Sequence, residues 1–350
     1  MQRKATALDV AKRAGVSRSA VSLVLNGRGD GNVAKESQDR IRQAAADLNY
    51  SPNPIALSLR NQRTRVIGIV SDEVVVSPFD GNIIGGADDV ARAHGFVTVV
   101  MDTERDASRD ESAVETLLDR QVDGLMYVTV GLKPLDVPQG MLRVPSVLAN
   151  CYDSSPAPRL HHVIPDEVSG GREATEHLLQ LGHRDIAFLA GAATSPAVPL
   201  RIVGHREAMA KAAIPVREDR VFMAGWDIND GFHGAMGLLS ATERPTAIVC
   251  ANDRLAIGVA LAAARLGLSV PRDLSIMGYD DESRIAATMV PALTTMALPL
   301  REMGAAAMSM LLGQIEDPAR RPTSDGSGHL ETMVPCRLVV RESTGPVPAL

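Results

Sequence analysis

Aromatic residues, cysteine and long apolar runs are all scarce in this sequence of 350 residues. Aromatic residues make up 3% of the chain, which argues against the stacking platforms that bind single-stranded nucleic acid. The three cysteines are isolated, so we expect core thiols rather than disulfides or metal ligands. No run of about 18 apolar residues is present, which excludes a membrane-spanning helix. No apolar run follows the basic N-terminus either, so we expect a cytoplasmic protein without a secretory leader.

The charge is distributed unevenly along the chain. Residues 1–65 contain 12 Lys and Arg against 5 Asp and Glu, whereas the whole chain carries a net charge of −6. A basic head on an acidic body is the asymmetry expected when the head alone touches nucleic acid.

Residues 7–26 have the pattern of a helix-turn-helix. Thr6 and Asp9 are spaced for a capping box, Gly15 suits the sharp turn, and Ser17 can cap the second helix. The outer face of that helix meets base edges and phosphates in the major groove when the motif binds DNA. A plain helical hairpin is the alternative, and the basic charge of the head argues against it. We expect DNA contacts from Thr6, Ser17, Arg18, Ser19, Ser22 and Asn26.

Apolar strands alternate with helical patterns from Val66 onward, which predicts parallel α/β sheets. The stretch is too long for one sheet, so we expect two lobes with a ligand cleft between them. The predicted fold class is an all-α head followed by a two-lobed α/β body. The expected boundaries are 1–50 for the head, 51–65 for a short hinge helix and linker, and 66–350 for the body. Within the body we expect lobe 1 at 66–160 and 293–320, and lobe 2 at 161–292 and 329–342.

Ordered motifs along nearly the whole chain resemble bacterial repressors of the LacI/GalR family. The resemblance implies a DNA-binding head, a hinge, and a body like that of a periplasmic sugar-binding protein. It also implies that Leu59 wedges into the minor groove, with backbone contacts from Asn53 and Arg60. Ala20 and Leu23 depart from the Thr and Arg that many relatives carry, so the operator sequence stays open. Motifs that carry the resemblance include Leu8-Asp9-Val10-Ala11, Tyr50-Ser51-Pro52-Asn53, Leu181-Gly182-His183-Arg184, Val270-Pro271-Arg272-Asp273 and Gly278-Tyr279-Asp280-Asp281.

The same resemblance implies an effector site in the cleft. The guanidinium of Arg201 suits a sugar diol or a carboxylate, and the amide of Asn252 both donates and accepts hydrogen bonds. Asn252 and Asp280 could instead cap the helices that follow them, and Trp226 could belong to the core. The expected ligand-binding residues are Phe79, Asp80, Asn150, Arg201, Trp226, Asn252 and Asp280.

These patterns together predict a homodimeric repressor that binds near-palindromic, double-stranded operator DNA and responds to a small-molecule effector, a sugar that acts as an inducer. A purine-dependent corepressor mechanism is one alternative, and a cytoplasmic sugar-binding protein with a vestigial head is another. No nucleophile, base and orienting group come together in the sequence, and no metal-ligand spacing is present. We therefore expect no enzyme activity, no metal and no cofactor.

Overall fold

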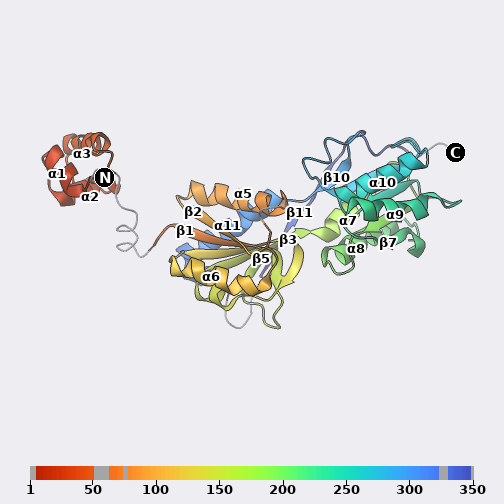
Figure 1. Ribbon diagram of the computed structural model, residues 1–350, viewed down its shortest axis with the longest axis horizontal. Coiled ribbons are helices and arrows are strands. Elements are labelled where there is room, and N and C mark those ends of the chain that lie inside the picture. The colour runs from red at the N-terminus through yellow and green to blue at the C-terminus, as the bar shows by residue number, and fades with distance from the viewer. Residues whose placement is uncertain (1–4, 51–62, 74–77, 323–329, 348–350) are drawn as a thin grey trace. The chain divides into compact units, whose positions relative to one another are not determined.

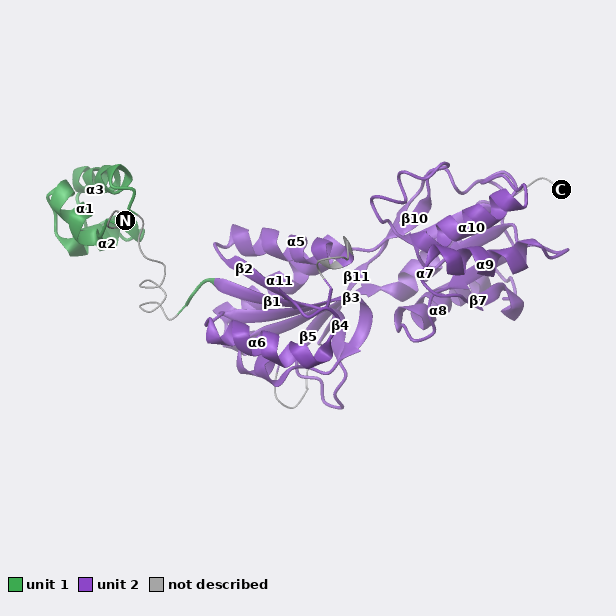
Figure 2. Cartoon of the chain, in the orientation of Figure 1, with its two compact units in different colours: residues 1–65 green, residues 66–350 purple. Residues whose placement is uncertain are grey.

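The computed structural model describes residues 5–50, 63–73, 78–322 and 330–347, without the side chains of Pro78 and Asp80. The chain divides into two compact units, residues 1–65 and residues 66–350 (Figure 2). In the described residues, no helix is long and apolar enough to cross a membrane.

The first unit consists of three short helices around a small apolar core. The capping box between Thr6 and Asp9 is present at the first helix, and Gly15 ends that helix at φ +66°. Ser17 caps the second helix by accepting a hydrogen bond from the amide of Ala20 at 3.1 Å. Apolar residues from all three helices meet in the core, so the predicted helix-turn-helix is confirmed, and a third helix packs against it. The helices are α1 (Ala7–Ala14), α2 (Arg18–Leu25) and α3 (Lys35–Asp47).

The first lobe of the body contains a parallel sheet in the order β11-β5-β4-β3-β1-β2. Alternate residues of β1 face opposite sides: Ile67 and Ile69 pack under α5 and α11, and Val70 packs under α6 (Figure 1). The elements are β1 (Val66–Ser71), α5 (Pro78–Ala93), β2 (Val97–Asp102), α6 (Asp110–Asp119), β3 (Gly124–Leu135), β4 (Ser146–Asp153), β5 (His161–Asp166), α11 (Leu300–Glu316) and β11 (Glu331–Pro335).

The second lobe contains a sheet in the order β12-β10-β9-β8-β6-β7, in which only the β10–β12 pair is antiparallel. Helix α7 packs on α8, and α9 packs on α10. The elements are α7 (Glu167–Gln180), β6 (Ile186–Ala190), α8 (Ala197–Lys211), β7 (Val221–Met223), α9 (Ile228–Leu239), β8 (Ala247–Cys250), α10 (Asp253–Arg265), β9 (Ser275–Asp280), β10 (Thr294–Ala297) and β12 (Arg337–Val339).

The boundary between the lobes differs from the expected one at three strands. Strands β5 and β11 belong to the first sheet, where we expected the second, and β10 belongs to the second sheet, where we expected the first. The cause is pairing between segments far apart in sequence, since β5 pairs with β4 on one side and β11 on the other. In the described residues, the chain passes between the sheets after β5, after β10 and after β11.

Glycines bring three pairs of helices into backbone contact. A Cβ atom on Gly204 of α8 would lie 2.0 Å from the carbonyl oxygen of Val168 on α7. Such an atom cannot be accommodated without moving a helix, because the neighbouring atom is backbone. The same close approach joins α5 with α11 and α9 with α10, so each pair packs as one rigid layer. The glycines are Gly86 with Gly304, Gly171 with Gly204, and Gly231 with Gly258.

Candidate functional site

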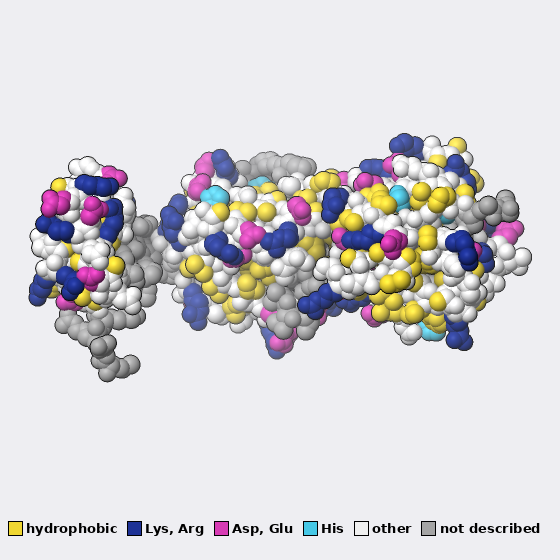
Figure 3. Space-filling model, turned by 90° about the horizontal axis from the view of Figure 1, so that it is seen from above, with side chains coloured by type: hydrophobic (Ala, Val, Ile, Leu, Met, Phe, Trp, Pro, Cys, Tyr) yellow, Lys and Arg dark blue, Asp and Glu magenta, His cyan; other side chains and the backbone are white. Residues whose placement is uncertain are grey.

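The N-terminal end of α2 presents polar side chains to solvent. Arg18 and Ser19 are exposed, while Val21 and Val24 on the opposite face are buried against the other helices. An N-terminal helix end also carries a partial positive charge, which favours phosphate oxygens. The end of α2 therefore combines a guanidinium, a hydroxyl and a favourable dipole on one surface, in a unit whose surface shows several Lys and Arg side chains (Figure 3).

Other expected DNA contacts have partners inside the first unit. The Asn26 side chain donates to the carbonyl oxygen of Ser22 at 2.6 Å and contacts the Ser22 hydroxyl at 3.2 Å. The Thr6 hydroxyl donates to Asp9 at 2.7 Å. These hydrogen bonds fix the two ends of the helix-turn-helix. A role of Thr6, Ser22 and Asn26 in DNA binding stays a prediction. Asn53, Leu59 and Arg60 lie outside the described residues.

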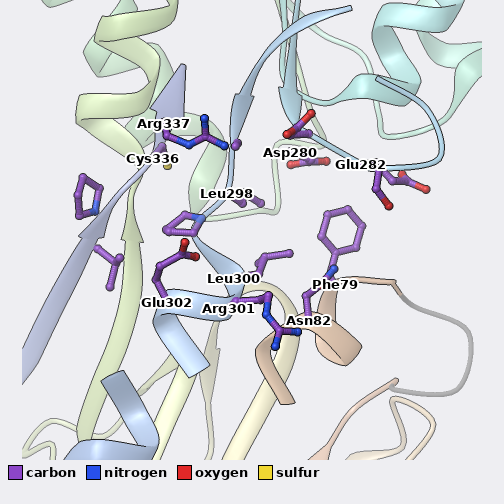
Figure 4. Close-up of a pocket in the computed structure, with 16 residues that line it drawn as sticks. Phe79, Asn82, Asp280, Glu282, Leu298, Leu300, Arg301, Glu302, Cys336 and Arg337 are labelled. Atoms are coloured by element: carbon purple, nitrogen blue, oxygen red, sulfur yellow. The ribbon is translucent and has the colours of Figure 1, made fainter. Parts of the chain in front are cut away.

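A cavity of ≈ 590 Å³ lies between the two lobes (Figure 4). Phe79 and Asn82 line it from α5 in the first lobe, and Asp280 lines it from the end of β9 in the second. The remaining lining comes from residues 281–283, from residues 297–302 where the chain crosses into α11, and from residues 334–337 where β11 leads to β12. The cavity therefore touches both lobes and two of the crossings between them.

Ion pairs neutralise several charges on the cavity wall. The carboxylate of Asp281 accepts from Arg341 at 2.7 Å, Glu282 lies 3.4 Å from Arg254, and Arg301 pairs with Asp89. Asp280 is partly buried at the end of β9, with φ +109°. Burial raises the pKa of Asp280 well above its usual value, although the nearby Arg201 opposes this. A raised pKa favours the protonated carboxyl, which can donate a hydrogen bond to a ligand hydroxyl as well as accept one.

Arg201 makes its contacts inside the second lobe rather than in the described cavity. Its guanidinium forms two hydrogen bonds with Glu167, from Nε at 2.7 Å and from Nη2 at 2.8 Å, and a third with the carbonyl oxygen of Ala251. The ring of Tyr279 lies 3.7 Å from the guanidinium carbon. Burial by itself lowers the pKa of Arg201, but the negative charge of Glu167, the neighbouring Tyr279 and Asp280, and the hydrogen bonds to Glu167 together raise it, so the arginine stays charged.

Three more of the expected ligand residues hold structural positions outside the cavity wall. Asn150 donates to the carbonyl oxygen of Thr129 at 2.9 Å. Asn252 caps α10 through the amide of Leu255 at 2.7 Å and donates to the carbonyl oxygen of Trp226 at 3.0 Å. The Trp226 ring fills the space over Gly191, where a Cβ atom would lie 2.2 Å from it. The structure thus places Phe79 and Asp280 on the cavity wall, and Asn150, Arg201, Trp226 and Asn252 away from it; the side chain of Asp80 lies outside the described part.

Two buried carboxylates near the site were not among the expected residues. Glu167 begins α7 and holds Arg201, and Asp253 accepts from Thr295 at 2.6 Å and from the amide of Glu282 at 2.7 Å. Burial raises the pKa of Asp253 to about 7. The sequence signals Glu167 only weakly, as a second carboxylate directly after a strand. Nothing in the sequence indicates that Glu167 pairs with Arg201. Within the described residues, no cluster of three or more His, Cys, Asp or Glu could hold a metal ion.

Comparisons with known proteins agree with this architecture. Residues 6–53 match the family "Bacterial regulatory proteins, lacI family", and residues 175–344 match a "Periplasmic binding protein-like domain". The ribose operon repressor of Escherichia coli is 34% identical, over 90% of this chain and 94% of its own. The transcriptional repressor PurR of Pectobacterium carotovorum is 33% identical, over 89% of this chain and 90% of its own.

A solved structure extends the similarity to the full architecture. The crystal structure of the Lac repressor dimer bound to operator and an anti-inducer covers 98% of this chain and 100% of its own. The two are 28% identical, with a TM-score of 0.78. The chain therefore belongs to the LacI family of bacterial regulatory proteins and is a DNA-binding transcriptional regulator.

Proposed function

We propose that the chain is a homodimeric repressor whose operator affinity is controlled by a small, hydroxyl-rich molecule, a sugar, bound between the lobes. The observation that carries this proposal is the interlobe cavity, which is lined by both lobes and by two of the crossings between them. A ligand there contacts both sheets at once, so it stabilises one angle between the lobes over others. That differential affinity is what couples effector binding to operator binding.

A sugar fits the cavity wall better than a purine. Asp280 and the neighbouring carboxylates offer hydrogen-bond partners to hydroxyl groups, and Phe79 is the aromatic side chain among the described residues of the lining. A purine requires more aromatic surface for stacking on both faces. The relatives include a ribose operon repressor and PurR, so both effector classes belong in the test.

Dimerisation is supported by the exposed edge of the first sheet. Strand β2 is the outermost strand, and its valines are exposed, with Val97 at 63% and Val99 and Val100 each at 37%. Exposed valines on an edge strand attract a partner surface. A second copy of this chain would cover them and would place two heads for two half-sites of a near-palindromic operator.

Arg18→Ala should weaken binding to the operator by about 10- to 100-fold, because a guanidinium at this end of α2 contributes on the order of 1–3 kcal/mol to a base contact. The measurement is fluorescence anisotropy on the DNA upstream of this gene, at several salt concentrations. Arg265→Ala, which removes the same charge from α10 in the second lobe, is the control and should leave affinity unchanged. An equal loss on operator and unrelated DNA would show that Arg18 binds phosphate alone.

An effector should change operator affinity in the wild type and lose that effect in Asp280→Asn. The assay is operator anisotropy against a panel of neutral sugars and purine bases, and we expect a sugar to weaken DNA binding. The variant lacks the carboxyl group that the wild type offers to the ligand, whereas its DNA-binding head is unchanged. Glu316→Gln on α11 removes an exposed carboxylate far from the cavity wall and should respond as the wild type does. A response to purines alone would replace the sugar proposal with the corepressor alternative.

A further inference from the structure

Strand β3 bulges near its carboxyl end. Its pairing with β4 is regular from Leu125 to Val128 and resumes at Lys133, so that residues 129–132 face only Asn150 of the neighbouring strand. A segment with more residues than the strand beside it bends away from the regular ladder. We call residues 129–132 the β3 tip.

Hydrogen bonds hold the β3 tip in one conformation. The Thr129 hydroxyl donates to the carbonyl oxygen of Asn150 at 2.7 Å, and the Asn150 side chain donates to the carbonyl oxygen of Thr129 at 2.9 Å. Asp72, buried directly after β1, accepts from the Val130 amide at 2.9 Å and from the Lys133 ammonium group at 2.6 Å. The tip is therefore a fixed part of the first lobe.

The β3 tip packs against the second lobe through Leu132, which is 5% exposed. Strand β3 and helix α8 are in contact at this point (Figure 1). The contact is a small apolar cluster, separate from the apolar cores of the two lobes. Its members are Leu132 of β3, Tyr152 of β4 and Ile164 of β5 from the first lobe, and Ala197 and Leu200 of α8 from the second.

Both sides of this contact belong to rigid bodies. Helix α8 is joined to α7 by the close backbone approach at Gly171 and Gly204, so its first turn moves only with the second lobe. The β3 tip moves only with the first lobe, because Asp72 fixes it. A change in the angle between the lobes therefore breaks the contact at Leu132. Breaking it exposes apolar side chains to water, which is unfavourable in proportion to their area.

The cluster lies outside the effector cavity. None of its side chains lines the described cavity, whose wall includes the crossings after β10 and β11. It lies next to the remaining crossing, from β5 to α7, because Ile164 is near the end of β5. The angle between the lobes is thus open to two separate influences, a ligand in the cavity and an apolar contact outside it.

We propose that the β3 tip and the first turn of α8 form an interlobe latch, which holds the lobes at one angle before any effector binds. Leu132 in the first lobe and Leu200 in the second are the residues on which the latch depends. A cavity ligand then acts on lobes that already have a preferred angle. It binds more tightly if it favours the latched angle, and more weakly if it has to break the contact.

The test measures the distance between the lobes with two spin labels, by pulsed electron paramagnetic resonance. Asp119→Cys on α6 and Ala210→Cys on α8 place the labels at exposed positions of the two lobes, and the three native cysteines are buried. Labelled full-length chain is diluted into unlabelled chain, so that distances within one chain dominate whether or not the protein is a dimer. Without effector or DNA, we expect one narrow distribution of distances. A broad distribution in this otherwise wild-type chain would overturn the proposal.

Leu132→Asp in the labelled chain should shift most molecules to longer and more widely spread distances. A carboxylate cannot be buried unpaired in the apolar cluster, but it is hydrated once the lobes separate. Leu200→Asp makes the same change from the second lobe and carries the test if Leu132→Asp does not fold. Gly131→Asp is the matched control, because it adds the same charge to the β3 tip at an exposed position where a Cβ atom meets nothing within 4 Å.

The control should keep the narrow distribution of the wild type. Unchanged distances in folded Leu132→Asp or Leu200→Asp would overturn the proposal. An equal shift in Gly131→Asp would also overturn it, because charge at the tip and not loss of the apolar contact would then be the cause. No arm uses an effector, so failure of the sugar proposal leaves this test intact.

Discussion

Arg201→Met should destabilise the second lobe by about 3–5 kcal/mol, because it leaves the buried carboxylate of Glu167 without a counter-charge. Arg206→Met is a matched control on the same helix. Arg206 pairs with Glu218, and both side chains are largely exposed, at 49% and 73%. Breaking a pair of that kind costs about 0–1 kcal/mol. The measurement is urea unfolding of the full chain followed by Trp226 fluorescence, which reports on the second lobe alone because this is the chain's one tryptophan.

Replacing both charges separates the ion pair from the packing. Arg201→Met/Glu167→Met should recover most of the lost stability, since apolar residues of similar size often replace a buried pair without net cost. Equal losses for Arg201→Met and Arg206→Met would mean that water reaches Glu167, contrary to its burial. Substitution of Arg201 is therefore a poor probe of ligand binding, because instability of the second lobe and loss of the response to the effector would occur together.

Gly231→Ala should cost about 3 kcal/mol, at the upper end of what overpacking usually costs. Its Cβ atom would lie 2.3 Å from the carbonyl oxygen of Leu255 on α10, and a backbone atom cannot rotate aside. Gly237→Ala is the control on the same helix, because its Cβ atom would meet nothing within 4 Å. An exposed helical glycine replaced by alanine should stabilise by about 0.5–1 kcal/mol.

The same urea titration measures both glycine variants. Opposite signs for Gly231→Ala and Gly237→Ala are the expected outcome. Two stabilised variants would show that α9 and α10 can separate without cost, and the rigid layer inferred from the glycines would be wrong.

Local signals explain which parts of the fold could be predicted. Thr6, Asp9 and Gly15 act within a few residues of one another, so the first helix and its turn follow from spacing alone. The continuous apolar run of β1 likewise identifies a buried strand from its own residues. Strand β5 has no such signal, because it begins with two histidines and contains Pro165, and its place depends on pairing with β11 more than 160 residues later.

The same distinction applies to the candidate site. Asp280 could be predicted because it ends a strand at the edge where ligands bind in α/β folds, and the resemblance to known repressors supported it. The bond between Glu167 and Tyr279 joins residues 112 positions apart, and no periodicity or spacing predicts it. Arg201 was predicted as a ligand contact from the resemblance to known repressors and from the chemistry of its guanidinium, and its partners become visible only when the helices are packed.

The three crossings between the lobes also determine the order in which the protein can be completed during synthesis. Strands β1 to β5 leave the ribosome first, but α11 and β11, which cover and extend their sheet, come after every helix of the second lobe. At usual rates of translation the first sheet waits roughly 10–30 s for them. During that time the apolar faces of Ile67 and Ile69 lack the methionines of α11. The protein therefore most needs protection by chaperones while its first lobe is incomplete, even though synthesis of that lobe starts before synthesis of the second.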